Sequence, residues 1–453
     1  MTTQKATIPI STKKLPAPKK HWLWKNMKDF APNPLAFIMK NVAELGDTFE
    51  AEIPSRKFIM TANADLIKYV LQGNHRNYRK TKSYDQMRLL LGNGLVTSRG
   101  DFWRKQRRLA QPAFNKKNLE NLFQSMGAVV TDYMKELNNK RGQTIDIAHE
   151  MMAITAKIAI KSLFSADLDG DLLKVYDSMT DMQRYVVLRI HQPIFTPFYR
   201  FNGRHSRYEK SFEVMDGIIQ NLIRERQESG ESKDDLLQML MDARYEDTGE
   251  KMEYEQLRDE LLTIFSAGHE TSANAMAWTW YLLVQHPEIV EKLKEEAQAI
   301  LNGRLATFED LKQLTYTRQV LEEGMRLYPP AWIVGREAIE ADEWEGLEIE
   351  KDKNMQCCIY ALHHNAAYYP DPEKFDPERF TPEKVKARPS HHYMPFGAGP
   401  RFCIGNHFAM MEMQLILAAM VQNFDFELIE GQKIVMEPLI TLRPKYGIKL
   451  KVK

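Results

Sequence analysis

The stretch PFGAGPRFCIG, residues 395–405, brings a cysteine, an arginine and three glycines together in one short loop. A helix is predicted to begin just after Cys403, so its sulfur faces unpaired N–H groups and the positive end of the helix dipole, which favour the thiolate. The glycines at 397, 399 and 405 permit tight turns and a close approach of the backbone to a large ligand. Arg401 is suited to pairing with a carboxylate. The loop therefore predicts a thiolate ligand site, because a merely buried cysteine does not explain the arginine and the glycines together.

A zinc site does not fit this loop. Cys403 and His407 are four residues apart, but no second pair joins them, whereas zinc requires three or four protein ligands. The other cysteines, Cys357 and Cys358, lie in an apolar segment that is predicted to be a strand, and packing in the core is predicted for both. Three cysteines in 453 residues do not form a disulfide framework, which fits a reducing compartment.

A second polar group, AGHETS at residues 267–272, stands inside the longest predicted helix, residues 254–285. Gly268 weakens a helix by about 0.5–1 kcal/mol relative to alanine. The hydroxyls of Thr271 and Ser272 can bond back to carbonyls of the preceding turn and loosen the helix further. Taken by itself, the group is explained equally well as a functional site or as a polar kink.

The loop pattern Phe-x-x-Gly-x-Arg-x-Cys-x-Gly is filled at every position and closely resembles the haem-binding loop of the cytochrome P-450 family. In that family a cysteine thiolate holds the haem iron. The resemblance implies that Cys403 is the axial ligand of haem b, and that Phe396 and Gly405 belong to the same cofactor-binding loop. It extends over nearly the whole chain, from Phe49 to the ITLRP segment near the end.

The resemblance also assigns roles outside the loop. Glu270 and Thr271 match the family's acid–alcohol pair, in which the hydroxyl hydrogen-bonds dioxygen and the acid helps to relay protons through water. Ala267 would border the haem on the same helix. The residues that resemble partners of the haem propionates are Trp103, Arg107, Arg336, Arg401 and, more loosely, His391. The residues that resemble a buried structural cluster are Glu323, Arg326 and Arg379.

The elements that must position these residues are mostly helices. Helical patterns are predicted over residues 63–73, 118–137, 145–164, 207–228, 254–285, 287–303 and 405–421. A hairpin is predicted at residues 49–60, with its turn at Pro54–Ser55, and short strands follow at 331–339 and 354–362.

The long segment 364–401 has little periodicity and is rich in Pro, Asp and Glu, which is typical of a functional segment. The patterns together predict a single mainly α-helical haem domain with small β-sheets over residues 1–453, in which residues 1–20 form a flexible arm. The resemblance implies the cytochrome P-450 fold, with the haem buried between the long central helix and the Cys403 loop with its C-terminal helix.

The composition limits the kinds of partner and the location that we expect for this protein. Lys plus Arg exceed Asp plus Glu by only 62 − 61 = +1, which gives no reason to expect nucleic acid. No apolar run approaches the roughly 18 residues of a spanning helix, so we expect a cytoplasmic protein without an integral membrane anchor, and a monomer.

The electron supply is expected to come from other proteins. About fifty residues follow Cys403, which leaves no room for a fused reductase. The resemblance then implies that NAD(P)H acts only indirectly, through a ferredoxin or flavodoxin with its reductase. A weaker hypothesis is a basic docking patch for an acidic electron donor, formed by Arg104, Lys105, Arg108, Lys116 and Lys117.

The resemblance places an apolar substrate pocket beside the haem, which predicts a hydrophobic substrate. Its predicted lining residues are Val96, Ala267, Ala331, Ile333, Leu439 and Ile440. The chain looks most like the fatty-acid hydroxylase branch, in which an Arg and a Tyr hold the carboxylate. Arg56 stands at the Arg position, but Met60 stands at the Tyr position, so a terpenoid, a steroid or another lipid is an alternative substrate.

Two other functions are compatible with a haem-thiolate site. A non-catalytic sensor or carrier needs no proton relay, so Glu270 and Thr271 favour a monooxygenase that hydroxylates or epoxidises its substrate. A peroxide-driven hydroxylase typically lacks the acid–alcohol pair. The sequence thus favours a monooxygenase that uses dioxygen.

Overall fold

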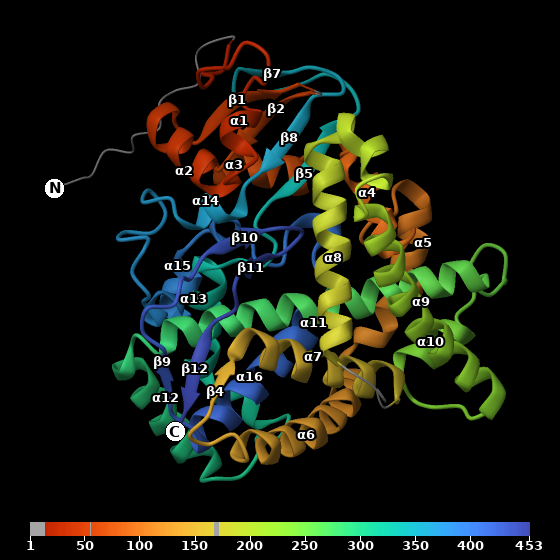
Figure 1. Cartoon of the computed structure of the whole chain (residues 1–453), viewed down its shortest axis with the longest axis vertical. Helices are drawn as coiled ribbons and strands as arrows, with labels where there is room; N and C mark the ends of the chain where they lie inside the picture. Colours follow the sequence, from red (N-terminus) through yellow and green to blue (C-terminus); the bar gives the residue numbers. More distant parts are fainter. Residues whose placement is uncertain (1–13, 55, 167–171) are drawn as a thin grey trace. The chain divides into compact units, whose positions relative to one another are not determined.

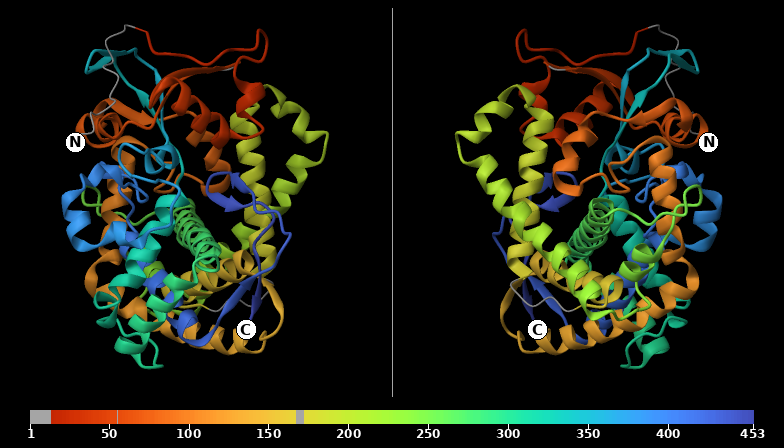
Figure 2. Two further views of the ribbon diagram at one scale, coloured as in Figure 1. Left: turned by 90° about the vertical axis from the view of Figure 1, so that its left-hand side faces the viewer. Right: turned by 90° about the vertical axis from the view of Figure 1, so that its right-hand side faces the viewer.

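The computed structural model describes residues 14–54, 56–166 and 172–453, and the chain divides into two compact units (Figures 1 and 2). Unit 1 comprises Met1–Tyr84 and Met325–Cys403, and unit 2 comprises Asp85–Gly324 and Ile404–Lys453. The predicted turn residue Ser55 and residues 1–13 of the predicted arm lie outside the described residues.

Unit 1 is built around a sheet of five strands in the order β1-β2-β8-β5-β3. β1 (Thr48–Ile53) and β2 (Arg56–Thr61) form the predicted hairpin, with Phe49 opposite Met60. The other strands are β3 (Tyr78–Lys80), β5 (Val334–Ala338) and β8 (Asn354–Cys357). The strand predicted over residues 354–362 is wrong in its second half, because Cys358 is already the N-cap of helix α14 (Ile359–His363).

Unit 1 also contains several short helices. They are α1 (Met27–Phe30), α2 (Pro34–Leu45), α3 (Ala64–Lys68), η1 (Tyr69–Gly73), η2 (His75–Asn77) and α15 (Pro382–Ala387). α3 begins where the Asn63 side chain accepts a hydrogen bond from the Leu66 N–H at 2.9 Å, and it packs its apolar face into the core of unit 1. A separate hairpin joins β6 (Asp342–Trp344) to β7 (Leu347–Ile349).

The described end of the predicted arm lies against β1. The Pro16 carbonyl accepts a hydrogen bond from the Glu50 N–H at 2.9 Å, and Lys20 pairs with Glu52 at 2.7 Å. The segment 364–401 contains α15 and otherwise only short turns of 3₁₀ helix, as its lack of periodicity predicts. These turns are η6 (Pro377–Phe380), η7 (Ser390–His392) and η8 (Gly399–Arg401).

Unit 2 is mainly helical. Its helices, including two that reach into unit 1 at one end, are α4 (Ser83–Leu91), α5 (Gly100–Ala110), η3 (Gln111–Phe114), α6 (Lys116–Asn138), α7 (Ile147–Phe164), α8 (Leu172–His191), η4 (Pro193–Arg200), α9 (Arg204–Ser229), α10 (Leu236–Asp242), α11 (Tyr254–Leu283), α12 (Pro287–Leu301), η5 (Asp310–Lys312), α13 (Thr315–Leu327) and α16 (Asn406–Asn423). The helices predicted at 118–137, 207–228, 254–285 and 287–303 are confirmed within a few residues. The prediction over 145–164 is confirmed from Ile147 onward, since residues 144–146 form strand β4. α8 was not predicted.

α11 is the central helix of unit 2, and Figure 1 shows it crossing that unit beside α7 and α16. It is apolar on nearly all sides, which is typical of a helix buried in a large core. Trp278 is 1% exposed, and its indole N–H donates to the Leu442 carbonyl at 3.1 Å. α11 is therefore fixed to the strand hairpin near the C-terminus.

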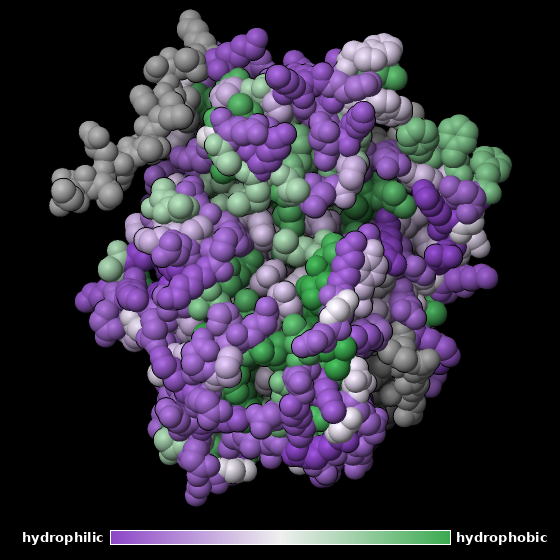
Figure 3. Space-filling model, turned by 60° about the vertical axis from the view of Figure 1, so that its left-hand side comes forward, coloured by the Kyte–Doolittle hydropathy of each residue, from purple (hydrophilic) through white to green (hydrophobic). Residues whose placement is uncertain are grey.

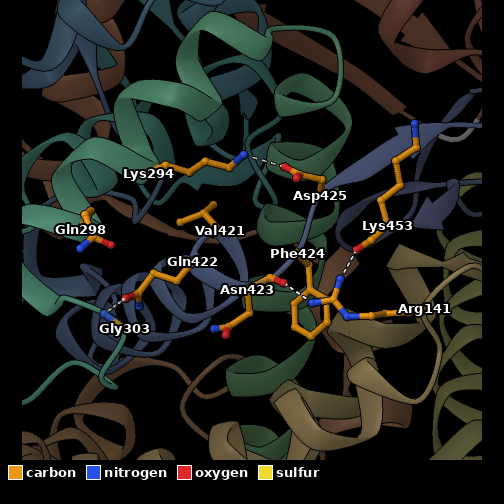
Figure 4. Close-up of a pocket in the computed structure, with 10 residues that line it drawn as sticks. All are labelled: Arg141, Lys294, Gln298, Gly303, Val421, Gln422, Asn423, Phe424, Asp425 and Lys453. Atoms are coloured by element: carbon orange, nitrogen blue, oxygen red, sulfur yellow. Dashed lines mark hydrogen bonds and ion pairs between the residues drawn. The ribbon is translucent and has the colours of Figure 1, made fainter.

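Two small sheets complete unit 2. One contains β4 (Thr144–Asp146), β12 (Lys449–Val452) and β9 (Phe426–Leu428), and the other is the hairpin of β10 (Met436–Pro438) and β11 (Leu442–Pro444). Arg141 donates to the carbonyls of Lys453 at 2.5 Å and Asn423 at 2.6 Å, which ties down the end of the chain (Figure 4). The hollow drawn there is lined by none of the predicted site residues.

Hydrophilic side chains cover much of the face drawn in Figure 3, in keeping with 27% charged residues in the chain. Among the described residues, no helix is both long enough and apolar enough to span a membrane.

Candidate functional site

The Cys403 loop is shaped by backbone hydrogen bonds. The Cys403 N–H donates to the Phe396 carbonyl at 3.0 Å, and the Phe402 N–H donates to the Gly399 carbonyl at 3.0 Å. Cys403 is exposed, and α16 begins three residues later at Asn406, with Gly405 as its N-cap. The loop therefore presents a thiol at its surface while its backbone is held in tight turns.

Each glycine of the loop has a different role. Gly397 and Gly399 have φ values of +75° and +66°, in the left-handed region that favours glycine. A Cβ on Gly399 would lie 2.1 Å from the Leu71 carbonyl oxygen, so the close approach here is to the chain's own backbone. Gly405 has a φ of −94°, and its nearest neighbour would be 3.9 Å from a Cβ. The predicted role of Gly405 in the approach of the backbone to a large ligand stays a prediction.

A chain of hydrogen bonds within unit 1 supports the loop from behind. Arg326 donates to the carbonyls of His363 at 2.9 Å and Lys374 at 3.2 Å, and His363 Nε2 accepts from the Met394 N–H at 3.0 Å. The Met394 carbonyl in turn accepts from the Gly397 N–H at 3.1 Å. Arg326 thus acts on the loop through a buried histidine.

Two of the three residues of the predicted structural cluster show the expected burial. Glu323 and Arg326, one turn apart on α13, are both 0% exposed. Arg379 is half-buried and donates to the Asp371 carbonyl at 2.9 Å. The mutual pairing of the three side chains stays a prediction.

Cys357 and Cys358 contrast with Cys403. Both are 0% exposed, and burial raises the pKa of each thiol to about 12. The predicted packing role of these two residues is confirmed, and neither presents a thiolate near neutral pH.

α11 carries one accessible strip. Between Asp259 and Trp280 every residue is buried except Ala267, Gly268 and Thr271, which share one face of the helix. A Cβ on Gly268 would meet no atom within 4 Å. The strip therefore borders open space at the position where the sequence predicts the acid–alcohol pair.

The hydroxyls of this motif bond back to their own helix, as predicted. Thr271 Oγ1 donates to the Ala267 carbonyl at 2.8 Å, and Ser272 Oγ donates to the Gly268 carbonyl at 3.2 Å. α11 nevertheless continues without a break from Tyr254 to Leu283, so the hydroxyls do not disrupt it. His269, two residues before Thr271, is buried, and its Nδ1 lies 2.7 Å from the Phe265 carbonyl.

Glu270 points away from this strip into a polar cluster that the sequence did not predict. Thr441 Oγ1 donates to Glu270 Oε1 at 2.6 Å, and Gln183 Nε2 of α8 makes a short hydrogen bond to Oε2. The sequence pointed to Thr441 only indirectly, because this residue follows the predicted pocket residues Leu439 and Ile440. Gln183 had no signal, because α8 was not recognised as a helix.

The loop that contains Val96 is anchored on α11. The Asn93 N–H donates to Asp259 at 2.6 Å, and the Leu95 N–H donates to Glu260 at 2.9 Å. Gly92 has a φ of +55°, and a Cβ there would lie 2.1 Å from the Asp259 side chain, so this position requires glycine. Val96 is half-buried and held at a fixed place along α11.

The predicted propionate partners lie in several places. Trp103 and Arg107 are half-buried and four residues apart on α5, so they share a face as predicted. In unit 1, Arg336 is 7% exposed on β5 and Arg401 is half-buried on η8. His391 Nε2 lies 2.9 Å from Asp65, so in this structure its ring is engaged with α3.

The predicted pocket residues are placed on separate elements. Leu439 and Ile440 are half-buried in the turn between β10 and β11, whereas Ala331 and Ile333 are half-buried just before β5. Arg56 donates to Ser83 Oγ at 2.8 Å, and burial lowers the pKa of its guanidinium. Met60 is 1% exposed in the core of unit 1, so it contributes no group that could bind a carboxylate.

The predicted basic patch is partly neutralised by acids. Lys105 pairs with Asp247, and Arg108 pairs with Glu246 at 3.1 Å. Arg104 likewise pairs with Asp101 on its own helix. Surface pairs of this kind contribute little stability, but they make the local charge less positive than the sequence suggests.

Comparison with known proteins defines the class. The cytochrome P450 family model matches residues 15–452, and the chain belongs to this family of haem-dependent monooxygenases. The mainly helical fold with small separate sheets agrees with this assignment.

Several relatives align over most of the chain. It is 33% identical over 406 residues to cyclooctat-9-en-7-ol 5-monooxygenase of Streptomyces melanosporofaciens, covering 88% of this chain and 86% of the relative. It is 31% identical over 418 residues to cyclooctatin synthase of the same organism, covering 91% and 90%. It is 31% identical over 372 residues to cytokinin hydroxylase of Arabidopsis thaliana, covering 80% and 72%.

The family implies a haem with a cysteine thiolate ligand, and the Cys403 loop fits such a group. Of the three cysteines, Cys403 alone is exposed, and the backbone around it is held in shape by the protein itself. A soft thiolate ligand suits an iron porphyrin. The donor chemistry at this position therefore agrees with the family's cofactor.

Glu412 on α16 is a buried acid that the sequence did not single out. It is 0% exposed, and neither carboxyl oxygen has a hydrogen-bond partner among the described residues. Burial raises its pKa to about 8, and the nearby Ser272 hydroxyl opposes this only in part, because its proton is used on the Gly268 carbonyl. Glu412 is thus protonated at neutral pH, unlike an exposed glutamic acid.

This acid predicts a loss of stability with rising pH. Between about pH 4.5 and 8 the folded state binds the Glu412 proton and the unfolded state does not, so the free energy of unfolding falls as the pH rises through this window. The total loss is about 5 kcal/mol at 1.36 kcal/mol per pKa unit. We expect Glu412→Gln to remove this slope and to be more stable than the wild type at pH 9, measured by urea unfolding from pH 5 to 9. The exposed Glu430→Gln is the control, and equal slopes in all three proteins would contradict the assignment.

Proposed function

We propose that this chain is a haem-thiolate monooxygenase that hydroxylates or epoxidises a hydrophobic substrate, with Cys403 as the iron ligand and Glu270 with Thr271 as the proton-relay pair. The observation that supports this most directly is the accessible strip on α11. In a helix that is otherwise buried from Asp259 to Trp280, the open positions include the predicted alcohol, Thr271, and its neighbour Glu270 is the predicted acid.

Each residue has a definite task in this proposal. A haem at Cys403 supplies dioxygen binding and activation when it is bound. Ala267 and Gly268 leave room beside the helix because their side chains are small. The Thr271 hydroxyl donates to the Ala267 carbonyl and keeps lone pairs that can accept a hydrogen bond from water. Glu270 would exchange protons with water at its carboxylate.

The substrate that we favour lacks a carboxylate. Arg56 is already bonded to Ser83, and Met60 is buried, so the pair that would hold a fatty acid is incomplete. The relative named cyclooctat-9-en-7-ol 5-monooxygenase acts, by its name, on an alcohol. We therefore place a terpenoid or steroid alcohol ahead of a fatty acid. Electrons would reach the site from a ferredoxin or flavodoxin with its reductase.

The substrate class can be tested by ligand binding. We expect terpenoid alcohols to shift the Soret band of the ferric protein at concentrations about tenfold lower than fatty acids of the same carbon number, because Met60 supplies no hydrogen bond to a carboxylate beside Arg56. Arg56→Gln is the matched variant and should leave the binding of terpenoid alcohols unchanged. Tighter binding of fatty acids that is lost in Arg56→Gln would reverse the assignment.

A further inference from the structure

Two elements far from α11 in the chain hold the carboxylate of Glu270. Gln183 Nε2 of α8 donates to one oxygen, and Thr441 Oγ1, in the turn of the β10–β11 hairpin, donates to the other at 2.6 Å. The exposed fractions are 4% for Glu270, 0% for Gln183 and 6% for Thr441, so bulk water does not compete for these bonds. Both carboxylate oxygens therefore have assigned protein donors.

The direction of the Thr441 hydroxyl is fixed by a third residue. Asn274 lies one turn after Glu270 on α11, and its Nδ2 donates to Thr441 Oγ1 at 3.1 Å. Since the Asn274 side-chain amide N–H₂ can only donate, Thr441 Oγ1 accepts this bond and its own proton points to Glu270. The threonine is thus oriented as a donor to the acid.

The same face of α8 is fixed to the same hairpin. Arg443 of β11 donates to Thr180 Oγ1 at 2.7 Å and makes a short hydrogen bond to the Tyr176 hydroxyl. Arg184 pairs with Glu437 of β10 at 3.2 Å. Tyr176, Thr180 and Gln183 recur at helical spacing, so a single polar face of α8 bonds both the hairpin and the acid.

The cluster also has an open acceptor. Gln183 Oε1 is buried and has no hydrogen-bond partner among the residues that the structure describes. A buried acceptor of this kind is normally satisfied by water. A water molecule here would be held by the same side chain that binds Glu270, within the polar cluster of the proposed relay.

We propose that Gln183 and Thr441 are positioning residues for Glu270, and that together they hold its carboxylate in the geometry of the proposed proton relay. The proposal rests on the proposed function, because it assumes that Glu270 relays protons. In the proposed role, the hydrogen bonds keep the carboxylate in one place between α8 and the turn of the β10–β11 hairpin. Loss of either bond lets the acid leave the relay geometry without removing it.

The experiment compares two variants of one residue in the haem-loaded protein. Thr441→Val keeps the shape of threonine and loses the hydroxyl, whereas Thr441→Ser keeps the hydroxyl and loses the methyl group. We expect Thr441→Val to raise the fraction of NAD(P)H diverted to peroxide about tenfold, as misplacement of a general acid does, and Thr441→Ser to stay close to the wild type. A packing role predicts the opposite order.

Two further variants sharpen the test. Gln183→Met removes the second donor at similar volume and should raise peroxide release as Thr441→Val does. The methionine variant also provides a result if the valine variant fails to fold. In a Glu270→Ala background, Thr441→Val should have no further effect on peroxide release, because both changes act through the same carboxylate. Thr180→Val is the control, since it weakens the bond between α8 and the hairpin without touching Glu270.

A second readout does not require turnover. In the substrate-free protein we expect Thr441→Val and Gln183→Met, but not Thr441→Ser, to speed hydrogen exchange in residues 436–444 about tenfold, and Glu270→Ala to abolish the difference between valine and serine. Additive effects of Thr441→Val and Glu270→Ala in both readouts would overturn the proposal.

Thr271→Ala distinguishes a failure of the proposed proton relay from a failure of the proposed positioning role of Gln183 and Thr441. If Thr271→Ala diverts electrons to peroxide while Thr441→Val and Gln183→Met do not, the relay assignment stands and the positioning inference is wrong. If Thr271→Ala remains fully coupled, the proposed proton relay itself is wrong.

Discussion

Replacing Cys403 by serine is expected to abolish the red-shifted Soret band of the reduced CO complex and to reduce product formation to background. A serine oxygen is a harder ligand than a thiolate and does not supply the same electron density to the iron. The loop itself should keep its shape, because the Cys403 N–H to Phe396 carbonyl bond does not involve the side chain. The measurement is the reduced CO difference spectrum together with product analysis.

Cys358→Ser is the matched control for this experiment. Its sulfur lies 3.8 Å from the Trp332 carbonyl, and a serine hydroxyl can donate to the same oxygen. The control should retain the band. A normal band in Cys403→Ser, or its loss in Cys358→Ser alone, would show that the ligand has been assigned to the wrong cysteine.

Arg326→Ala should produce the largest loss of stability and of haem content. The side chain is 0% exposed and donates to the carbonyls of His363 and Lys374. Its loss strands buried polar groups, which costs about 3–5 kcal/mol for a buried charged residue. The His363 ring that fixes Met394, and with it the start of the Cys403 loop, then loses its support.

The measurements are the ratio of haem to protein after purification and the midpoint of thermal unfolding. We expect less than half of the wild-type haem content. Arg318→Ala, on the same helix but 61% exposed and paired with Glu322 at the surface, serves as the control and should bind haem normally. Normal haem content in Arg326→Ala would show that the buried arginine does not support the loop.

Local patterns predicted much of the fold. The hairpin, the long central helix and the helix that begins at Pro287 each carry a signal within their own residues. α8 carried such a signal too, because its buried apolar residues recur at helical spacing as Val175, Met179, Met182 and Val186. This pattern is interrupted by polar residues that face the cluster around Glu270, which hides the helix from a search for apolar runs.

The partners of the predicted acid could not be predicted from the sequence. Gln183 and Thr441 lie 87 and 171 residues away from Glu270, and no short motif connects such distant side chains. Position 399 is a second example. It requires glycine partly because the Leu71 carbonyl, distant in the chain, lies close to it. The sequence shows directly which chemical group stands at each position, whereas the contacts that orient the group depend on the tertiary fold.

The close packing of Gly399 against Leu71 bears on how the protein acquires its cofactor. The thiol loop is shaped in part by the backbone of unit 1, because contacts of the chain with itself fix its bends. A preorganised loop loses little conformational entropy when a ligand binds. The contact between Gly399 and Leu71 therefore contributes to ligand binding at Cys403 without touching the ligand itself.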